Sequence, residues 1–205
     1  MRQKLCWILL NVTIYRKSGG KLTRPDWRRD NVNRFIERIY KGIKAEKNYV
    51  KFGISPFGIW KPGYPAGITG SSQYDELYAD AKLWLNKGWV DYFTPQLYWP
   101  IAPARQSFTS LLKWWESENT YKRHLWPGVK SANRPQEIVN QINVTRQVVP
   151  NSAGVIHWSI AGLTGNAGMV KAIKDGPYQT KALVPRTTWL AANPLLQPSL
   201  LLTKS

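Results

Sequence analysis

Short apolar segments alternate along the chain with longer stretches in which apolar residues recur at the spacing of a helix face. Four of the short segments are predicted to be buried strands, at residues 50–55, 90–98, 124–129 and 154–160. Helical patterns lie before, between and after them, with apolar residues three and four positions apart. This alternation predicts an α/β fold with a parallel sheet and right-handed crossovers.

Five helices are predicted from these apolar stripes and from residues typical of helix ends. Aspartate and serine suit an N-cap, proline suits a first turn, and Gly88 suits the position after a helix. The predicted helices begin near Asp26 and near Ser71 or Ser72, cover about 107–118, open with Pro135 and cover about 167–174.

The number of strands leaves two architectures open. Strands about 30 to 40 residues apart suit a barrel or an open doubly wound sheet, and four strands are half of an eight-stranded barrel, which takes about 250 residues. At 205 residues the chain is long enough for one domain with a core. No glycine-rich phosphate loop follows a predicted strand, so the main signal of nucleotide binding is missing.

Composition excludes several classes of protein. The single cysteine, Cys6, rules out an internal disulfide framework, and one cysteine with two histidines is too few for a Cys/His zinc site. The chain has no apolar run of about 18 residues, so no membrane span is predicted. Residues 1–10 lack the long apolar region and the cleavage site of a signal peptide. We therefore expect no metal and no cofactor, and the sequence alone assigns no cellular location.

The strong positive charge keeps nucleic-acid binding open. Lys and Arg number 29 against 12 Asp and Glu, a net charge of +17, and the chain has 11 Trp and 10 Tyr. Basic and aromatic residues together are typical of proteins that bind single strands. The basic residues are spread along the chain, so a solvated basic surface is the preferred interpretation. The basic residues of the first predicted helix are interpreted in the same way (Arg28, Arg29, Arg34, Arg38 and Lys41).

The segment 89–99 carries the clearest candidate chemistry. Residues two apart on a strand share a face, which places Gln96 and Tyr98 on one side and Trp99 on the other. An amide can hydrogen-bond sugar hydroxyls as donor and as acceptor, and an indole can stack on the apolar face of a sugar ring. The segment therefore indicates a carbohydrate site, and a purely structural aromatic strand is the alternative.

Several segments together resemble the glycosyl hydrolase-like family 10, a bacterial group of barrel proteins. The resemblance covers about residues 11 to 195, and it implies a (β/α)8 TIM-type barrel and the hydrolysis of glycosidic bonds. It rests on residues 26–34 (DWRRDNVNR), 50–60 (VKFGISPFGIW), 74–80 (YDELYAD), 88–99 (GWVDYFTPQLYW) and 154–159 (GVIHWS), and on the tail 178–185 (YQTKALVP) with Trp189.

The resemblance implies that the chain carries about strands 5 to 8 of this barrel with their helices. The family's domain begins with four more strands and an acidic motif of the type HFDDY, which this sequence lacks. The expected organisation is an unmatched segment 1–10, the C-terminal half of the barrel at 11–177, and an extension at 178–205 that packs on the barrel or leaves it. A half barrel exposes strand edges, so self-association is expected. For the full-length family, an extracytoplasmic or cell-envelope location is expected.

Glycoside hydrolysis normally needs two carboxyl groups, and the sequence offers no convincing pair. Eleven of the 12 acidic residues fall at helix starts or on helical patterns, and only Asp91 lies within a predicted strand. Asp91 comes early in that strand, whereas barrel active sites lie at the C-terminal strand ends. A structural role is therefore preferred for Asp91, with catalysis as the weaker alternative.

A binding site can still be assembled from the ends of the predicted strands, which meet at one rim of a parallel barrel. Trp158 is either a stacking surface for a sugar or an outward residue packed on helices. His157 either faces inward or is a hydrogen-bonded core residue, and Lys130 either binds an acidic sugar or faces solvent. The candidate substrate-binding residues are Ser55, Trp60, Gln96, Tyr98, Trp99, His157 and Trp158.

The sequence therefore favours a glycoside hydrolase that acts on a polysaccharide or cell-wall glycan, present as a truncated chain that is weakly active or inactive. A carbohydrate-binding remnant without chemistry is the first alternative. A basic nucleic-acid binder is the second, and it is disfavoured because the charge is not gathered in one block.

Overall fold

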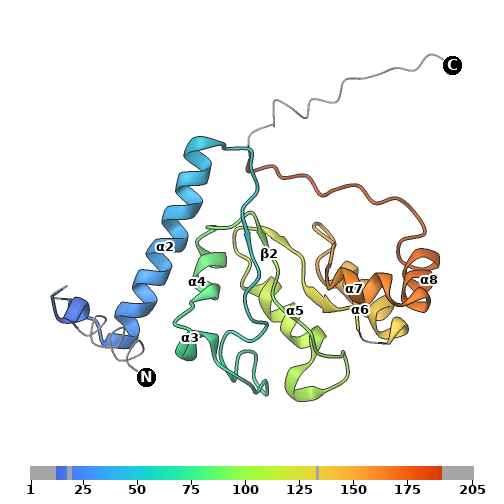
Figure 1. The fold of residues 1–205 in the computed structure, drawn as a ribbon, viewed down its shortest axis with the longest axis horizontal. Helices are drawn as coiled ribbons and strands as arrows, with labels where there is room; N and C mark the ends of the chain where they lie inside the picture. Colours follow the sequence, from blue (N-terminus) through green and yellow to red (C-terminus); the bar gives the residue numbers. More distant parts are fainter. Residues whose placement is uncertain (1–12, 18–19, 133, 191–205) are drawn as a thin grey trace, which may run out of the picture.

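The protein folds as a mixed α/β structure in which every paired strand described is parallel (Figure 1). The computed structural model describes residues 13–17, 20–132 and 134–190. Three strands form one sheet in the order β1-β2-β3, and two form a second sheet, β4-β5. The predicted α/β class with a parallel sheet is confirmed.

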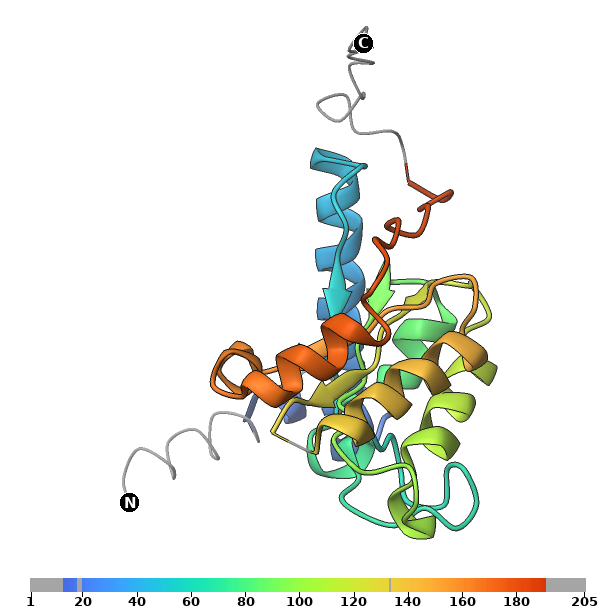
Figure 2. The ribbon, with the colours of Figure 1, turned by 90° about the vertical axis from the view of Figure 1, so that its right-hand side faces the viewer.

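Helices and strands alternate along the described chain, and α6 and α8 lie side by side (Figure 2). None of the described helices is both long and apolar enough to cross a membrane. The elements are α2 (Arg24–Glu46), β1 (Gly53–Ile54), α3 (Gln73–Glu76), α4 (Ala81–Asn86), β2 (Tyr92–Phe93), η1 (Ala104–Gln106), α5 (Phe108–Ser117), β3 (His124–Leu125), β4 (Gly128–Lys130), α6 (Pro135–Val148), β5 (Ile156–Trp158), α7 (Ile160–Thr164) and α8 (Ala167–Asp175).

Each of the four predicted strand segments contains paired strand residues. The segment 124–129 is divided, because β3 pairs with β2 whereas β4 pairs with β5. Pro127 lies at the division and has no N–H for a ladder hydrogen bond. The two sheets are still linked, since Gln96 forms isolated parallel bridges with Phe57 and with Gly128.

One face of the sheets packs on the helices. Phe93 and Leu125 are register partners on this face, and both are fully buried. The Phe93 ring lies 5.0 Å from the ring of Trp115 in α5. Val129 in β4 is also fully buried. Burial of such side chains is worth about 1.5 to 3 kcal/mol each, so this face supplies most of the core.

The opposite face is built from glycine and stacked aromatic rings. Tyr92 stacks on Trp126 with ring centroids 5.1 Å apart. Gly53 is the register partner of Tyr92, and a Cβ at Gly53 would lie 2.2 Å from the Tyr92 ring. Glycine is therefore required beside this tyrosine. On β5 the same face carries Trp158, which is 63% exposed.

The second predicted helix, from Ser71 or Ser72 to about Gly88, is wrong as a single helix. The structure divides it into α3 and α4, and Tyr78 between them has a φ of 54°. Two caps explain the division. The Ser72 hydroxyl accepts from the backbone N–H of Asp75, and the Asp80 carboxylate accepts from the N–H of Leu83. Each cap starts its own helix, so the apolar stripe is interrupted.

The first, third, fourth and fifth predicted helices are confirmed as α2, α5, α6 and α8. The solvated face predicted for α2 is wrong at Arg29, which is 6% exposed. Its guanidinium lies 3.6 Å over the Tyr74 ring, donates to the Tyr74 carbonyl and pairs with Asp26. The short helix α7 was not predicted.

A buried carboxylate joins four parts of the chain at the start of β2. Asp91 is fully buried. It accepts from the backbone N–H of Phe52 at 2.8 Å and from the indole N–H of Trp189 at 2.9 Å. It pairs with Lys44 of α2, and the Tyr40 hydroxyl lies 3.4 Å away. A buried charge persists only when it is paired and hydrogen-bonded, so these contacts hold α2, β1, β2 and the C-terminal segment together.

The described C-terminal residues run back from α8 toward the end of α2 (Figure 1). The Arg186 carbonyl lies 3.2 Å from His124 Nε2, and the Trp189 ring packs edge-on against His124 at 5.0 Å. Burial lowers the pKa of His124, and Lys51 lowers it further, while the Arg186 carbonyl and Asp91 act in the opposite direction. Residues 178–190 of the predicted extension therefore contact the α/β body, whereas residues 1–10 and 191–205 lie outside the described residues.

Replacing Asp91 with Asn should destabilise the fold strongly, because it leaves the Lys44 ammonium partly buried without its counter-charge. We expect the free energy of unfolding to fall by about 3 to 5 kcal/mol in urea titrations. The matched control is Asp30→Asn, which breaks an exposed pair with Arg34 and should cost less than about 1 kcal/mol. Equal losses in the two variants would contradict the role given to Asp91.

Acidification should destabilise the chain through its two histidines, His124 and His157. Burial lowers the pKa of both below their ordinary value of 6.5. The stability that their neutral forms contribute is therefore complete above about pH 6.5 and is lost as the pH falls below that value toward the folded-state pKa. Urea midpoints between pH 7.5 and pH 5.5 should fall in the wild type and change little in the double variant His124→Gln/His157→Gln. An unchanged pH slope in the double variant would refute this cause.

Candidate functional site

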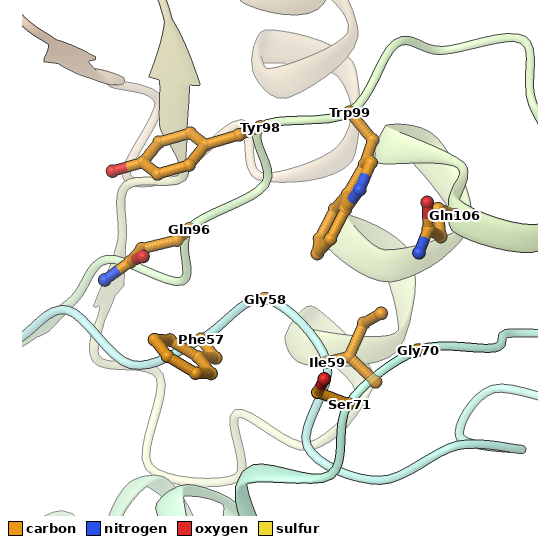
Figure 3. A pocket seen from close by; sticks show the side chains of 9 residues that line it. All are labelled: Phe57, Gly58, Ile59, Gly70, Ser71, Gln96, Tyr98, Trp99 and Gln106. Carbon is orange, nitrogen blue, oxygen red and sulfur yellow. The ribbon is translucent and has the colours of Figure 1, made fainter.

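A cavity of about 380 Å³ lies beyond the C-terminal ends of β1 and β2. Its walls come from the loop after β1, from the segment after β2 and from η1 (Figure 3). The carboxyl ends of parallel strands are where α/β proteins usually bind their ligands. The lining residues are Phe57, Gly58, Ile59, Gly70, Ser71, Gln96, Tyr98, Trp99 and Gln106.

Gln96 is held in place by the strand ends on both sides. Its backbone bridges Phe57 and Gly128. Its side-chain nitrogen donates to the Ser55 carbonyl at 3.1 Å. One amide proton and the amide oxygen remain for a ligand, since no partner among the described residues takes them. Gln96 can therefore both donate to and accept from a hydroxyl group.

The loop after β1 lies against the segment after β2 at Gly58. A Cβ at Gly58 would lie 2.5 Å from the Gln96 carbonyl oxygen and 2.8 Å from the Trp99 ring. The Gly58 carbonyl accepts from the indole N–H of Trp115 at 2.8 Å. The absence of a side chain lets the two backbones approach, and the Trp115 hydrogen bond fixes the loop to α5.

The predicted alternation of residues 96–99 does not hold. Tyr98 and Trp99 both line the cavity, although they are neighbours in sequence. The N–H of Leu97 donates to the carbonyl of Pro95 at 2.9 Å, which is a tight turn rather than a strand continuation. This turn brings the amide, the phenol and the indole to the same cavity (Figure 3).

Tyr98 and Trp99 give the cavity its aromatic wall. Burial raises the pKa of Tyr98, so its hydroxyl stays protonated and can donate a hydrogen bond at neutral pH. The Trp99 ring hangs between Tyr98 and Gln106 in Figure 3. The Trp99 carbonyl accepts from the Gln141 side chain at 3.0 Å, which anchors the backbone of the wall to α6.

Two predicted binding residues, Ser55 and Trp60, are not among the residues that line this cavity. Ser55 contributes its carbonyl to Gln96. Trp60 stacks on Trp114 with ring centroids 6.0 Å apart, and its indole N–H donates to Asp80 at 3.0 Å. Trp60 therefore packs the outer side of the loop.

The predicted residues of β5 also lie outside the lining. Trp158 is exposed and is the register partner of Lys130, which is exposed on β4. His157 is a register partner of Val129, and its ring nitrogens lie 3.1 Å from the Ser131 hydroxyl and 3.1 Å from the Tyr178 hydroxyl. Burial lowers the pKa of His157. The histidine is thus hydrogen-bonded on both nitrogens.

No carboxylate lines the cavity. Asp91 lies before the paired residues of β2, at the opposite end from Gln96. Most other acids hold structural partners, and Glu137, for example, accepts from the backbone N–H of Ile101 at 2.8 Å. The acids with a hydrogen bond or an ion pair are Asp26, Asp30, Glu37, Asp75, Glu76, Asp80, Asp91, Glu116, Glu118, Glu137 and Asp175.

The sequence indicated three of the nine lining residues: Gln96, Tyr98 and Trp99. The others lie in irregular segments, and the strongest available signal was the dense run of glycine and proline between residues 56 and 70. No group of three or more His, Cys, Asp or Glu side chains in the described part of the chain is placed to hold a metal ion.

Comparison with known proteins gives a consistent family. A model of the glycosyl hydrolase-like 10 family matches residues 9–145. The chain is 39% identical to glycosyl hydrolase YngK of Bacillus subtilis (strain 168) over 182 residues, 80% of this chain and 36% of YngK. It is 41% identical to glycosyl hydrolase DigH of Escherichia coli (strain K12) over 106 residues, 49% of this chain and 24% of DigH. It therefore spans about a third of the one relative and about a quarter of the other.

Proposed function

Because this chain belongs to the glycosyl hydrolase-like 10 family, we propose that its described residues form the glycan-binding side of a glycoside hydrolase. The observation that carries the proposal is the cavity in which Gln96, Tyr98 and Trp99 meet without a carboxylate. The amide and the phenol can exchange hydrogen bonds with sugar hydroxyls, and the indole can cover the apolar face of a ring. The substrate class is a polysaccharide or a cell-wall glycan.

The second part of the proposal concerns architecture. The described strands act as a portion of a (β/α)8 barrel, about strands 5 to 8, with the cavity at its C-terminal rim. The parallel order and the position of the cavity after β1 and β2 support this assignment. The remaining candidates, Ser55, Trp60, His157 and Trp158, stay predictions, and among them the exposed Trp158 is the best placed to stack on a sugar.

The third part is that binding occurs here without bond cleavage. Hydrolysis needs an acid and a base or nucleophile on either side of the glycosidic bond. Asp91 is fully buried and already accepts from Phe52, Trp189 and Lys44. Its contacts support a structural role over a catalytic one. The chain is then a carbohydrate-binding part of its family's enzyme, which is also the alternative function indicated by the sequence.

Removing the Gln96 amide should weaken glycan binding selectively. In calorimetric titrations with soluble cell-wall and polysaccharide oligomers, Gln96→Ala should raise the Kd by roughly fivefold or more, because one hydrogen-bonding group is worth about 1 kcal/mol. Trp99→Ala should abolish detectable binding through the loss of stacking. Gln136→Ala, an exposed glutamine on α6 outside the cavity, is the matched control. Equal binding by Gln96→Ala and the control would count against the cavity.

The purified chain should release no new reducing ends from peptidoglycan or from a panel of polysaccharides. We expect its signal to equal that of Gln96→Ala under the same conditions, since neither has a carboxylate pair at the cavity. Robust turnover by the wild type that is lost in Gln96→Ala would overturn the binding-only assignment while keeping the site.

A further inference from the structure

The described sheets end in two strand edges that are open in a complementary way. The Phe52 and Ile54 carbonyls on either side of Gly53 accept hydrogen bonds from the β2 segment. Alternation along a parallel strand therefore turns the Gly53 N–H and C=O away from β2. At the other end, Ile156 donates to Pro127 and the Trp158 carbonyl accepts from Ser131. By the same alternation, the backbone groups of His157 point away from β4.

Exposed apolar side chains lie beside these edges. Ile156 and Trp158 are 44% and 63% exposed on β5, and Ile160, which begins α7, is 71% exposed. Phe57 follows β1 and is 47% exposed. Because Ile156 shares its face with Gly128, and Gly128 and Phe57 both bridge Gln96, these side chains lie on the sheet face that is not packed on helices. Such a continuous apolar surface favours a protein partner.

We propose that the partner is a second copy of this chain, which pairs β1 of one copy with β5 of the other. The described strands are all parallel, and the chain offers one open edge at each end of its strand order. A two-fold axis parallel to the strands keeps every strand parallel and joins both pairs of edges at once. Each copy contributes four strand segments, counting the consecutive β3 and β4 as one. Two copies therefore supply the eight strands at which a parallel barrel closes.

Closure gives the assembly an end point. A two-fold contact of this kind is satisfied by two copies, whereas pairing without rotation would continue as an open series. The apolar side chains of both uncovered faces would fill the interior, as the inward residues of a barrel do. The proposal concerns association alone and does not rest on glycan binding.

Charge opposes this pairing at low salt. Each chain carries a formal net charge of +17, so two copies repel at long range. Screening weakens the repulsion between exposed charges, while burial of apolar surface is retained. Dimerisation should therefore strengthen as salt rises from about 0.15 M to about 1 M. Association through nucleic acid carried along in purification would weaken over the same range.

The decisive measurement is the mass of the full chain by light scattering after nuclease treatment, over a concentration series. We expect a limit of twice the 23.5-kDa chain mass, approached at lower concentration in high salt. Two differently tagged copies mixed as monomers should then co-purify. A monomer at all concentrations, or masses that increase without limit, would overturn the closed dimer.

Variants locate the contact. Ile156→Lys/Ile160→Lys places two charges on the uncovered face and should raise the dimer dissociation constant by at least about tenfold. The matched control, Val170→Lys/Leu183→Lys, adds the same charges at residues that are 45% and 95% exposed away from the strand edges. Both double variants replace exposed side chains, and equal helix signals by circular dichroism establish that both are folded. A dimer weakened equally by both would refute the edge contact.

Discussion

The fold depends on the burial of one charge. Asp91 has no exposed surface, and its oxygens receive groups from α2, from the residue before β1 and from the C-terminal segment. An ionised carboxylate in such a place is tolerable only while its partners stay in position. The requirement acts over long sequence distances, because Lys44, Phe52 and Trp189 must all arrive before the charge is satisfied. The long helix α2 and the returning C-terminal residues are attached to the sheet at this point.

This arrangement separates structural work from ligand chemistry along the strand direction. The amino ends of the strands hold the charges, the buried histidine and the C-terminal segment. The carboxyl ends hold neutral donors, acceptors and aromatic rings around an open cavity. Neutral groups suit a sugar, which carries many hydroxyls and usually little charge. The basic character of the chain is therefore a property of its surface and not of the cavity.

Much of the fold could be predicted from the sequence, because periodicity reports which residues are buried. The four strand segments and four of the five helices follow from that pattern. The pattern failed where a polar side chain outweighed it. Asp80 caps a new helix in the middle of an apolar stripe, and Arg29 finds a buried place over Tyr74. At the site, Gln96, Tyr98 and Trp99 could be found from their chemistry. Ser71 and Gln106 could not, because the path of a glycine- and proline-rich loop is decided by contacts distant in sequence.

The close approach at Gly58 has a consequence for how such a protein can change its specificity. Any side chain there would collide with the Gln96 backbone, so the cavity wall shared by the two strand ends is closed to ordinary substitution. The opposite wall, at Ser71 and Gln106, belongs to loops that tolerate insertions and exchanges. New ligand preferences in relatives of this chain would then evolve on one side only, with the strand-end side acting as an inherited template.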